Sequence, residues 1–252
     1  GSKIPQDPRG KRISWDNAEL EQLWQLLADK RPHVRERAKR AFAARQTSSA
    51  MRPFLDRLEK DRDTGLGENP PGALVRVWAL GQVRDAKAQK LIRGLLQHSD
   101  EKVRKTAAQA VSLHRDHAAF HSMIEILRDD TPANRRIAAE ALGRIGNQDA
   151  VPDLLAAAAD AGDRDLRHSI TYALIELADT ESLQAGIASS PPGTQAAALI
   201  ALDQIPGNLL QPDRVVPLLE SPNAVLKEAA DWLIRRHPDW SPELADWLET
   251  QL

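Results

Sequence analysis

Apolar and small residues recur along this chain at the spacing of a helix face. After Val103, for example, Ala107 follows at the fourth position and Ala110-Val111 at the seventh and eighth. Residues at these offsets lie on one side of an α-helix, because the helix has about 3.6 residues per turn. No alternation of apolar and polar residues, which would indicate a half-buried strand, competes with this pattern. The spacing therefore predicts an all-α chain.

The same pattern occurs seven times, which makes it a structural repeat. Its copies start at residues 34, 72, 103, 134, 166, 194 and 225, and most starts are 31 or 32 residues apart. A first amphipathic helix precedes each copy, as Leu91-Ile92 and Leu95-Leu96 do before Val103. Two helices in a repeat of this length are typical of solenoids, whose neighbouring repeats shield each other's apolar faces. We predict an α-α superhelix of about seven helical hairpins and a terminal helix in 241–252.

The repeat also predicts the domain organisation. Gly1 and Ser2 resemble the remnant of an expression tag, so we assign residues 1–14 to a tag remnant and an N-terminal extension. Residues 15–252 are assigned to one solenoid domain. The second hairpin carries an insertion at 61–71, which we interpret as a surface loop, and the sixth repeat is shortened.

Composition and charge narrow the function classes. The chain of 252 residues has no cysteine, which excludes disulfides, thiolate metal sites and a cysteine nucleophile. No apolar run is long enough to cross a bilayer, so we expect no membrane insertion. Residues 1–130 hold 25 Lys and Arg against 18 Asp and Glu, whereas residues 131–252 hold 9 against 18. The sequence therefore predicts a basic end and an acidic end.

Two stretches carry a resemblance to known repeats. The run Asp100-Glu101-Lys102-Val103-Arg104, with alanine three residues after the arginine, resembles HEAT repeats of the short bacterial type, and the pattern extends from Trp15 onward. Residues 167–179, followed by 197–204 and 230–240, resemble the HEAT segment of large planctomycete and verrucomicrobial multidomain proteins.

That second resemblance implies a larger parent protein. It implies an upstream β-propeller of the sugar-dehydrogenase type, a downstream c-type cytochrome domain and export from the cytoplasm to the periplasm or beyond. This chain has no Cys-x-x-Cys-His motif for haem attachment, so the resemblance assigns it no catalytic residue, haem ligand or other cofactor.

Two sets of polar residues have a structural and a functional interpretation. The arginines Arg35, Arg104, Arg135 and Arg167 keep register with the core positions, which favours hydrogen bonds that tie one repeat to the next over a ligand-binding ladder. The histidines His114, His117 and His121 crowd one junction, and the last two have the spacing of metal ligands on a helix. Because no third ligand is fixed beside them, we interpret them as a solvated turn and expect no metal site.

Basic and aromatic residues gather near the ends of the chain. Residues 30–45 hold the densest basic cluster, and a DNA-binding groove is the functional interpretation. A duplex groove requires Lys and Arg from many repeats, whereas the second half of this chain is acidic, so we expect no nucleic-acid partner. Five of the six tryptophans, which we expect to cover the apolar faces of the terminal repeats, lie near the ends: Trp15, Trp24, Trp232, Trp240 and Trp247.

The sequence contains no phosphate-binding glycine loop and no serine elbow, so we expect this segment not to be an enzyme. It predicts instead an interaction scaffold whose inner surface, lined by the second helices, contacts another protein or flanking domains of the parent chain. The candidate contact residues are Arg37, Arg40, Gln109, Glu140, His168, Tyr172 and Asp231. The alternatives are a DNA-binding HEAT-like protein, including the base-repair class, and a HEAT protein resembling bilin lyases.

Overall fold

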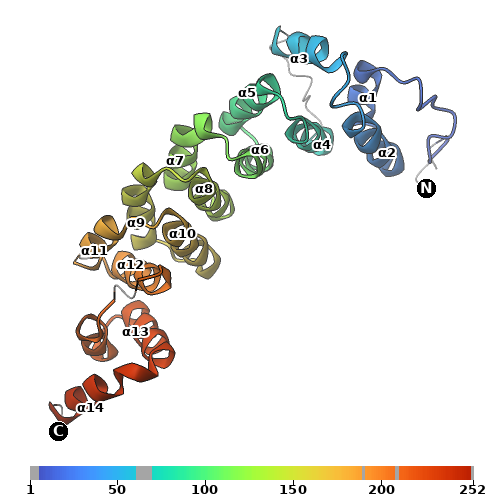
Figure 1. Ribbon diagram of the computed structural model, residues 1–252. Helices are drawn as coiled ribbons and strands as arrows, with labels where there is room; N and C mark the ends of the chain where they lie inside the picture. Colours follow the sequence, from blue (N-terminus) through green and yellow to red (C-terminus); the bar gives the residue numbers. More distant parts are fainter. Residues whose placement is uncertain (1–5, 61–69, 189–190, 208–209, 251–252) are drawn as a thin grey trace. The chain divides into compact units, whose positions relative to one another are not determined.

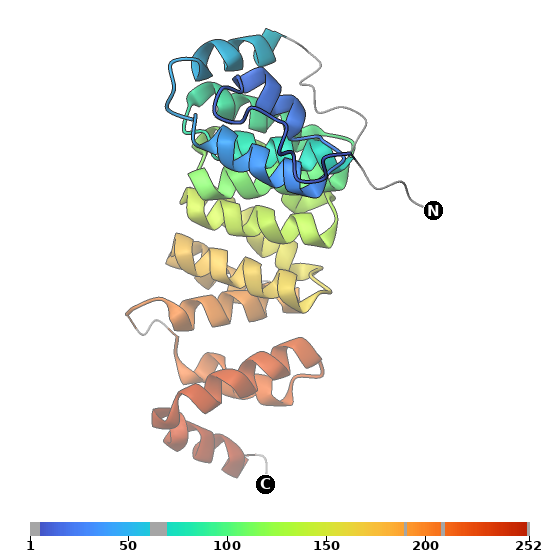
Figure 2. The same cartoon turned by 90° about the vertical axis from the view of Figure 1, so that its right-hand side faces the viewer.

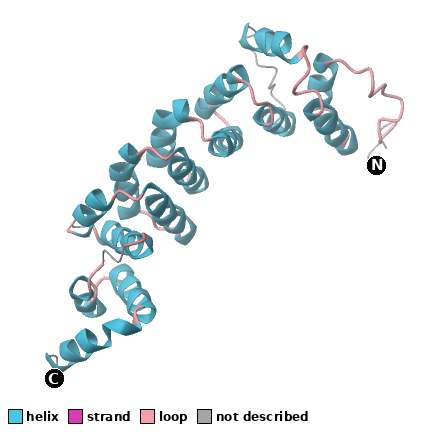
Figure 3. Cartoon of the chain, in the orientation of Figure 1, coloured by secondary structure: helices cyan, strands magenta, loops and turns pink. Residues whose placement is uncertain are grey.

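A computed structural model describes residues 6–60, 70–188, 191–207 and 210–250, and these residues form helices and turns without a strand (Figure 1, Figure 3). By their contacts they fall into two compact units, unit 1 at Gly1–Ala119 and unit 2 at Phe120–Leu252. No helix in the described ranges is long and apolar enough to cross a membrane. The tag remnant predicted at Gly1 and Ser2 lies outside the described residues.

Unit 1 contains three helical hairpins. The first helices α1, α3 and α5 pack against one another in sequence, and so do the second helices α2, α4 and α6. The first hairpin is α1 (Leu20–Leu26) with α2 (Pro32–Ala43), and the second is α3 (Met51–Lys60) with α4 (Pro70–Gly81). The third is α5 (Ala86–Gly94) with α6 (Glu101–His114), and the short 3-10 helix η1 (Leu95–Gln97) extends α5. A 3-10 turn, η2 (His117–Ala119), ends the unit.

Unit 2 contains four further hairpins and a last helix. They are α7 (Phe120–Asp129) with α8 (Pro132–Ile145), η3 (Gln148–Ala150) and α9 (Val151–Ala159) with α10 (Arg164–Leu177), α11 (Thr180–Ile187) with α12 (Pro192–Gln204), and the 3-10 helices η4 (Pro212–Arg214) and η5 (Val216–Glu220) with α13 (Ala224–Arg236). After them come η6 (Pro238–Trp240) and α14 (Ser241–Thr250).

The hairpins of unit 2 also form two layers. Helices α7, α9 and α11 make the first-helix layer, and α8, α10, α12 and α13 lie side by side in the second-helix layer (Figure 1, Figure 2). Both units thus repeat the same hairpin stack, and the predicted all-α solenoid fold is confirmed. That all of 15–252 forms one domain stays a prediction.

Short side chains start the second helices. The carboxylate of Asp100 accepts hydrogen bonds from the backbone N–H groups of Lys102 (2.7 Å) and Val103 (3.4 Å), and the Asn223 amide oxygen does the same at the start of α13. Such caps satisfy N–H groups that have no partner inside the helix. Proline opens α2, α8 and α12, where a missing N–H costs nothing.

The structure differs from the sequence prediction at two hairpins. The seventh hairpin begins with η4 and η5 instead of an α-helix, because Pro212 and Pro217 remove N–H donors and restrict the backbone. In the second hairpin, residues 61–69 of the predicted loop lie outside the described residues, but Pro70 and Pro71 already belong to α4.

Small residues allow the second helices to approach each other closely. Ala107 in unit 1 and Ala138 in unit 2 are fully buried. Gly143 of α8 faces α10 so closely that an added Cβ would lie 2.9 Å from Cα of Ala173. Unit 1 instead buries three aromatic rings against one another, with Trp24 5.9 Å from Phe42 and 5.6 Å from Phe54 between ring centroids.

Candidate functional site

One register position of the repeat faces outward on the second-helix layer of each unit. It is the sixth residue after the start of each copy, occupied in unit 1 by Arg40, Trp78 and Gln109 and in unit 2 by Glu140, Tyr172, Ile200 and Asp231. The rings of Trp78 and Tyr172 are exposed, by 39% and 51% respectively. Large exposed aromatic side chains are typical of contact surfaces.

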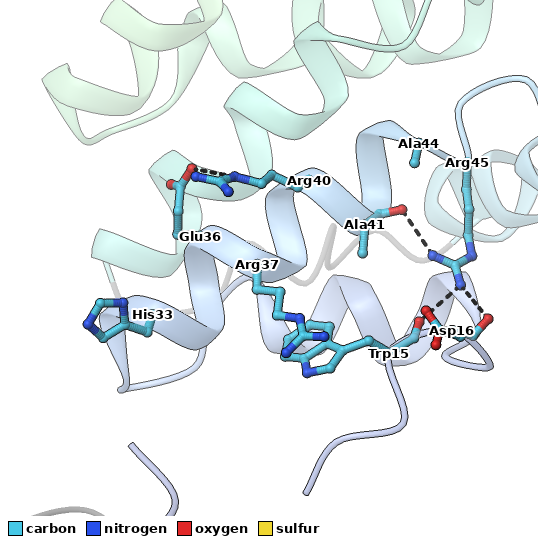
Figure 4. A pocket seen from close by; sticks show the side chains of 9 residues that line it. All are labelled: Trp15, Asp16, His33, Glu36, Arg37, Arg40, Ala41, Ala44 and Arg45. Atoms are coloured by element: carbon cyan, nitrogen blue, oxygen red, sulfur yellow. Dashed lines mark hydrogen bonds and ion pairs between the residues drawn. The ribbon is translucent and has the colours of Figure 1, made fainter. Parts of the chain in front are cut away.

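Unit 1 has an open pocket of about 640 Å³ between α2 and the segment that precedes α1 (Figure 4). The guanidinium carbon of Arg37 lies 4.7 Å from the centroid of the Trp15 ring. Arg45 donates hydrogen bonds to the carbonyl oxygens of Trp15 (3.2 Å) and Asp16 (3.1 Å), which holds this segment against α2. This unit 1 pocket is lined by Trp15, Asp16, His33, Glu36, Arg37, Arg40, Ala41, Ala44 and Arg45.

The cations of the unit 1 pocket have partners of opposite charge or polarity. Nε of Arg40 lies 3.5 Å from the Glu36 carboxylate, to which Nζ of Lys39 also donates a hydrogen bond at 3.1 Å. That hydrogen bond from Lys39 lowers the pKa of Glu36 below its ordinary value, with the nearby positive charges as further causes. Arg40 and Glu36 are thus engaged with each other, and the described lining of the pocket holds three arginines against two carboxylates.

Unit 2 has a groove of about 390 Å³ in its second-helix layer. Helix α12 supplies the floor, and α10 and α13 supply the two walls. The floor consists of Gly193, Ala196, Ala197 and Ile200, and Trp232 of α13, which is 40% exposed, forms part of one wall. The remaining lining residues of this unit 2 groove are Ala158, Arg164, Arg167, His168, Thr171, Val225, Glu228 and Ala229.

The apolar floor results from the sequence of α12. At the second position after the repeat start, α8, α10 and α13 carry Arg136, His168 and Lys227, whereas α12 carries Ala196. At the sixth position, α12 carries Ile200 where its neighbours are polar or aromatic. Small and aliphatic residues thus replace long polar ones on the outward face of this helix.

The start of α12 is fixed by close contact with α9. An added Cβ at Gly193 would lie 2.2 Å from the carbonyl oxygen of Ala158, so only glycine fits there without displacement of the backbone. The next residue, Thr194, is buried, and its hydroxyl donates a 2.8 Å hydrogen bond to the carbonyl of Leu155. These contacts set the depth of the groove floor.

Charged side chains line the groove unevenly. Arg164, Arg167 and His168 lie on the α10 wall, and Glu228 is the one acidic residue among the described residues that line the groove. Nη1 of Arg167 donates to the carbonyl of Ala161 at 3.0 Å. Arg164 and His168 are exposed and have no hydrogen-bond or ion-pair partner within the described part of the chain.

The structure distributes the predicted contact residues over several places. Arg37 and Arg40 meet in the unit 1 pocket, and His168 lies in the unit 2 groove, while Gln109 is exposed on α6. Tyr172 is exposed one turn after His168 and does not line the groove.

Glu140 and Asp231 are engaged with neighbouring side chains. Glu140 is half-buried, accepts a 3.3 Å hydrogen bond from the Ser169 hydroxyl and lies 3.8 Å from Arg136. Asp231 is exposed but pairs with Arg235 at 3.0 Å. The contacts of Glu140 indicate that it helps to hold α8 against α10.

The repeated arginines bind backbone carbonyls within their own hairpin. Arg35, Arg104 and Arg135 each donate a 2.8 Å hydrogen bond to a carbonyl at or just beyond the end of the preceding first helix, and Arg167 does so at 3.0 Å. Helix ends have carbonyls without an internal partner, and a cation satisfies them well. Arg135 also forms an ion pair with the next hairpin, to Asp160 at 2.8 Å, which is a link from repeat to repeat of the expected kind.

The histidines and tryptophans complete the comparison with the sequence prediction. Nε2 of His114 lies 2.5 Å from the carbonyl oxygen of Gly81, and His117 and His121 are exposed. In the described ranges, no group of three or more potential ligands is arranged to hold a metal ion. Trp15, Trp24 and Trp240 are buried as expected of covering residues, whereas Trp232 faces the unit 2 groove.

Trp240 belongs to a polar contact that holds the last hairpin. The His237 ring stacks on it with 4.0 Å between centroids, and Nε2 of His237 meets the carboxylate of Asp203, whose side chain is only 1% exposed. Nε of Arg236 also lies 3.2 Å from this carboxylate. A buried carboxylate needs such partners, since an unpaired one costs several kcal/mol.

Four residues of these surfaces were not predicted from the sequence: Trp78, Arg164, Ile200 and Glu228. Trp78 and Ile200 share the register position of the predicted contact residues, so that position alone was sufficient to find them. Arg164 and Glu228 line the groove only because α10 and α13 pack on α12. The sequence of a single repeat does not show this packing.

Comparisons with known proteins agree with this architecture. Residues 67–138 and 119–175 match the family model for HEAT repeats, which together is less than half of the chain. The chain therefore contains HEAT repeats. No curated protein matches the sequence.

Two solved structures have a similar backbone. The complex of CpcE and CpcF of phycocyanin lyase from Nostoc sp. PCC7120 has 20% identity and a TM-score of 0.48, with 100% of this chain and 99% of the other covered. An engineered protein has 17% identity and a TM-score of 0.44, with 86% and 96% covered. Neither similarity is close enough to carry an argument about function.

Proposed function

We propose that this chain is a non-catalytic interaction module, and that the second-helix layer of unit 2 binds a partner protein or a flanking domain. The single observation that carries the proposal is the unit 2 groove, in which an apolar floor is bordered by an exposed tryptophan and by charged side chains. Protein interfaces are built around such aromatic residues, surrounded by polar ones. HEAT repeats, which the chain contains, expose a long helix face suited to this use.

Several basic residues of unit 1 are bound by other groups of the protein, which disfavours the DNA-binding alternative. Arg31 forms hydrogen bonds with the Asp29 carboxylate, and Arg35 and Arg45 with backbone carbonyls. Lys87 and Lys90 pair with carboxylates on α3. Phosphate binding needs cations whose counterions are free to leave, whereas these cations are held by groups of the protein itself.

The parent protein is a narrower part of the proposal. The resemblance of residues 167–179 to a segment of planctomycete and verrucomicrobial multidomain proteins supports a place inside an exported protein of redox type. Sequencing the gene on both sides of this segment tests it. A Cys-x-x-Cys-His motif downstream supports this context, and flanking sequences without a propeller or haem motif contradict it.

Photo-cross-linking tests the interaction proposal. A photoreactive phenylalanine analogue replaces Tyr172 in the second-helix layer, and in a matched control it replaces Gln184, which is exposed on α11 in the first-helix layer. In an extract of the source organism, we expect the Tyr172 probe to form adducts with defined proteins, identified by mass spectrometry, that excess unlabelled chain suppresses. Equal labelling from both positions contradicts the proposal. So does the absence of any adduct that excess unlabelled chain suppresses.

A further inference from the structure

The unit 2 groove combines an apolar floor with a positive wall. Its floor residues are small or aliphatic, and the groove volume of about 390 Å³ offers room for a bulky apolar side chain. Trp232 borders this space and is 40% exposed. The Arg236 guanidinium lies 4.8 Å from the centroid of the Trp232 ring. An anchor side chain that enters here buries apolar surface on both partners.

The charge of the groove is opposite to that of the unit around it. Residues 120–252 hold 10 Lys and Arg against 21 Asp and Glu, a formal charge of −11. The described lining of the groove holds two arginines, Arg164 and Arg167, against the single carboxylate of Glu228. Since charges farther apart than about 8 Å are largely screened at physiological salt, the local positive wall decides which ligand fits.

The two acidic neighbours of Arg164 on α10 contact groups other than Arg164. The Asp163 carboxylate accepts hydrogen bonds from the backbone N–H groups of Asp165 and Leu166, both at 3.3 Å, and so caps the helix. Asp165 lies 3.9 Å from Arg136 of α8. The guanidinium of Arg164, which has no partner of its own within the described part of the chain, is therefore available for a carboxylate from outside.

We infer that the unit 2 groove binds an acidic segment of a partner protein, which inserts one bulky apolar side chain over α12 and places carboxylates against Arg164 and His168. This inference rests on the proposed function and specifies the chemistry of the partner. A basic segment would bring like charges together in a partly dehydrated site, which disfavours it.

A peptide of known sequence tests the inference on the full chain. The probe is a fluorescein-labelled helical peptide with leucine on one face and glutamate on the other, called the Glu–Leu peptide, and its counterpart carries lysine in place of glutamate. Fluorescence anisotropy measures the Kd of each. We expect saturable binding of the Glu–Leu peptide and at least about tenfold weaker binding of the lysine counterpart. Equal binding of both peptides overturns the inference.

Variants locate the binding within the groove. Trp232→Ala removes the aromatic wall, and we expect the Kd of the Glu–Leu peptide to rise about tenfold or more. Arg164→Gln removes one ion pair, for which we expect about a three- to fivefold rise. The matched control Arg214→Gln removes the same charge outside the groove and leaves the Kd unchanged. Circular dichroism confirms that each variant stays folded.

The outcomes separate this inference from the proposed function. If the Glu–Leu peptide does not bind but the Tyr172 probe still gives competed adducts, the inference falls and the interaction proposal stands. If both fail, both fall. Binding that survives both groove substitutions, or that a DNA duplex displaces, also overturns the inference.

Discussion

In unit 1 several ion pairs link the first helices. In unit 2, Arg128 of α7 likewise pairs with Asp153 of α9 at 2.5 Å, but the second helices are packed closely through glycine and alanine. Lys87 of α5 pairs with Asp56 of α3, Lys90 pairs with Glu59 at 2.5 Å, and Arg57 of α3 pairs with Glu21 of α1. In unit 2, α8 and α10 approach each other at Gly143 and Ala173. One repeat pattern therefore permits two kinds of stacking contact.

The difference between the units affects their surfaces as well as their stability. Small residues that bring helices together also leave space above them, and in α12 this space becomes the unit 2 groove. In the unit 1 pocket, Arg40 pairs with Glu36, Arg45 binds backbone carbonyls, and the Arg37 guanidinium lies over the Trp15 ring.

The larger effect is expected from filling the same repeat position in each unit. Gly81 and Gly143 are both the ninth residue after a repeat start. Gly143→Ala would place a Cβ 2.9 Å from the backbone of α10, so we expect the free energy of unfolding to fall by about 1–3 kcal/mol.

Gly81→Ala is the matched control for this experiment. Its added Cβ would meet only Cβ of Ala110, at 3.0 Å, and alanine favours the helix by about 1 kcal/mol, so we expect a change within about 1 kcal/mol. Urea denaturation followed by circular dichroism measures both variants. A larger loss at Gly81 than at Gly143 contradicts the proposed difference in stacking.

A smaller effect on stability is expected when the pH is lowered. Hydrogen bonds from Lys87 and Lys90 lower the pKa of Asp56 and Glu59, and a hydrogen bond from Arg31 lowers the pKa of Asp29, all in unit 1. A carboxylate whose pKa is lowered by folding stabilises the fold above its unfolded pKa, and this contribution disappears as the pH falls through the folded value.

We therefore expect unit 1 to lose protection before unit 2 as the pH falls below about 4. The effect is small because most of these pairs are exposed to solvent. Hydrogen exchange resolved by mass spectrometry, corrected for the intrinsic pH dependence of exchange, measures each unit separately. The double variant Asp56→Asn with Glu59→Gln serves as control, since it should weaken this dependence in unit 1. If both units lose protection from hydrogen exchange at the same pH, the prediction is contradicted.

The repeat made the fold predictable, because burial imposes the same residue types at the same positions in every hairpin. The periodicity predicted α8 and α10 as well as the buried positions of Ala107 and Ala138. It did not predict η4 and η5, since the apolar spacing there resembles a helix that the prolines prevent. The signal for the 3-10 turns was present in Pro212 and Pro217.

The site was less predictable than the fold. His168, which the sequence indicated as a contact candidate, lines the unit 2 groove, and its role in binding stays a prediction. Glu140 was chosen for its outward register, although it contacts Ser169 of the neighbouring helix. A register position indicates the direction of a side chain and not its partners. The groove depends on three helices together, and the contact of Gly193 with Ala158 that sets its depth joins residues 35 positions apart.

Hydrogen exchange of the full chain with and without the Glu–Leu peptide shows which helices the peptide contacts. A ligand that binds only the folded state slows the opening of the helices it contacts. We predict added protection in α10, α12 and α13, with unit 1 and the first-helix layer of unit 2 unchanged. Protection centred on α2 and the unit 1 pocket, or none in α12 while the peptide is bound, would contradict the account.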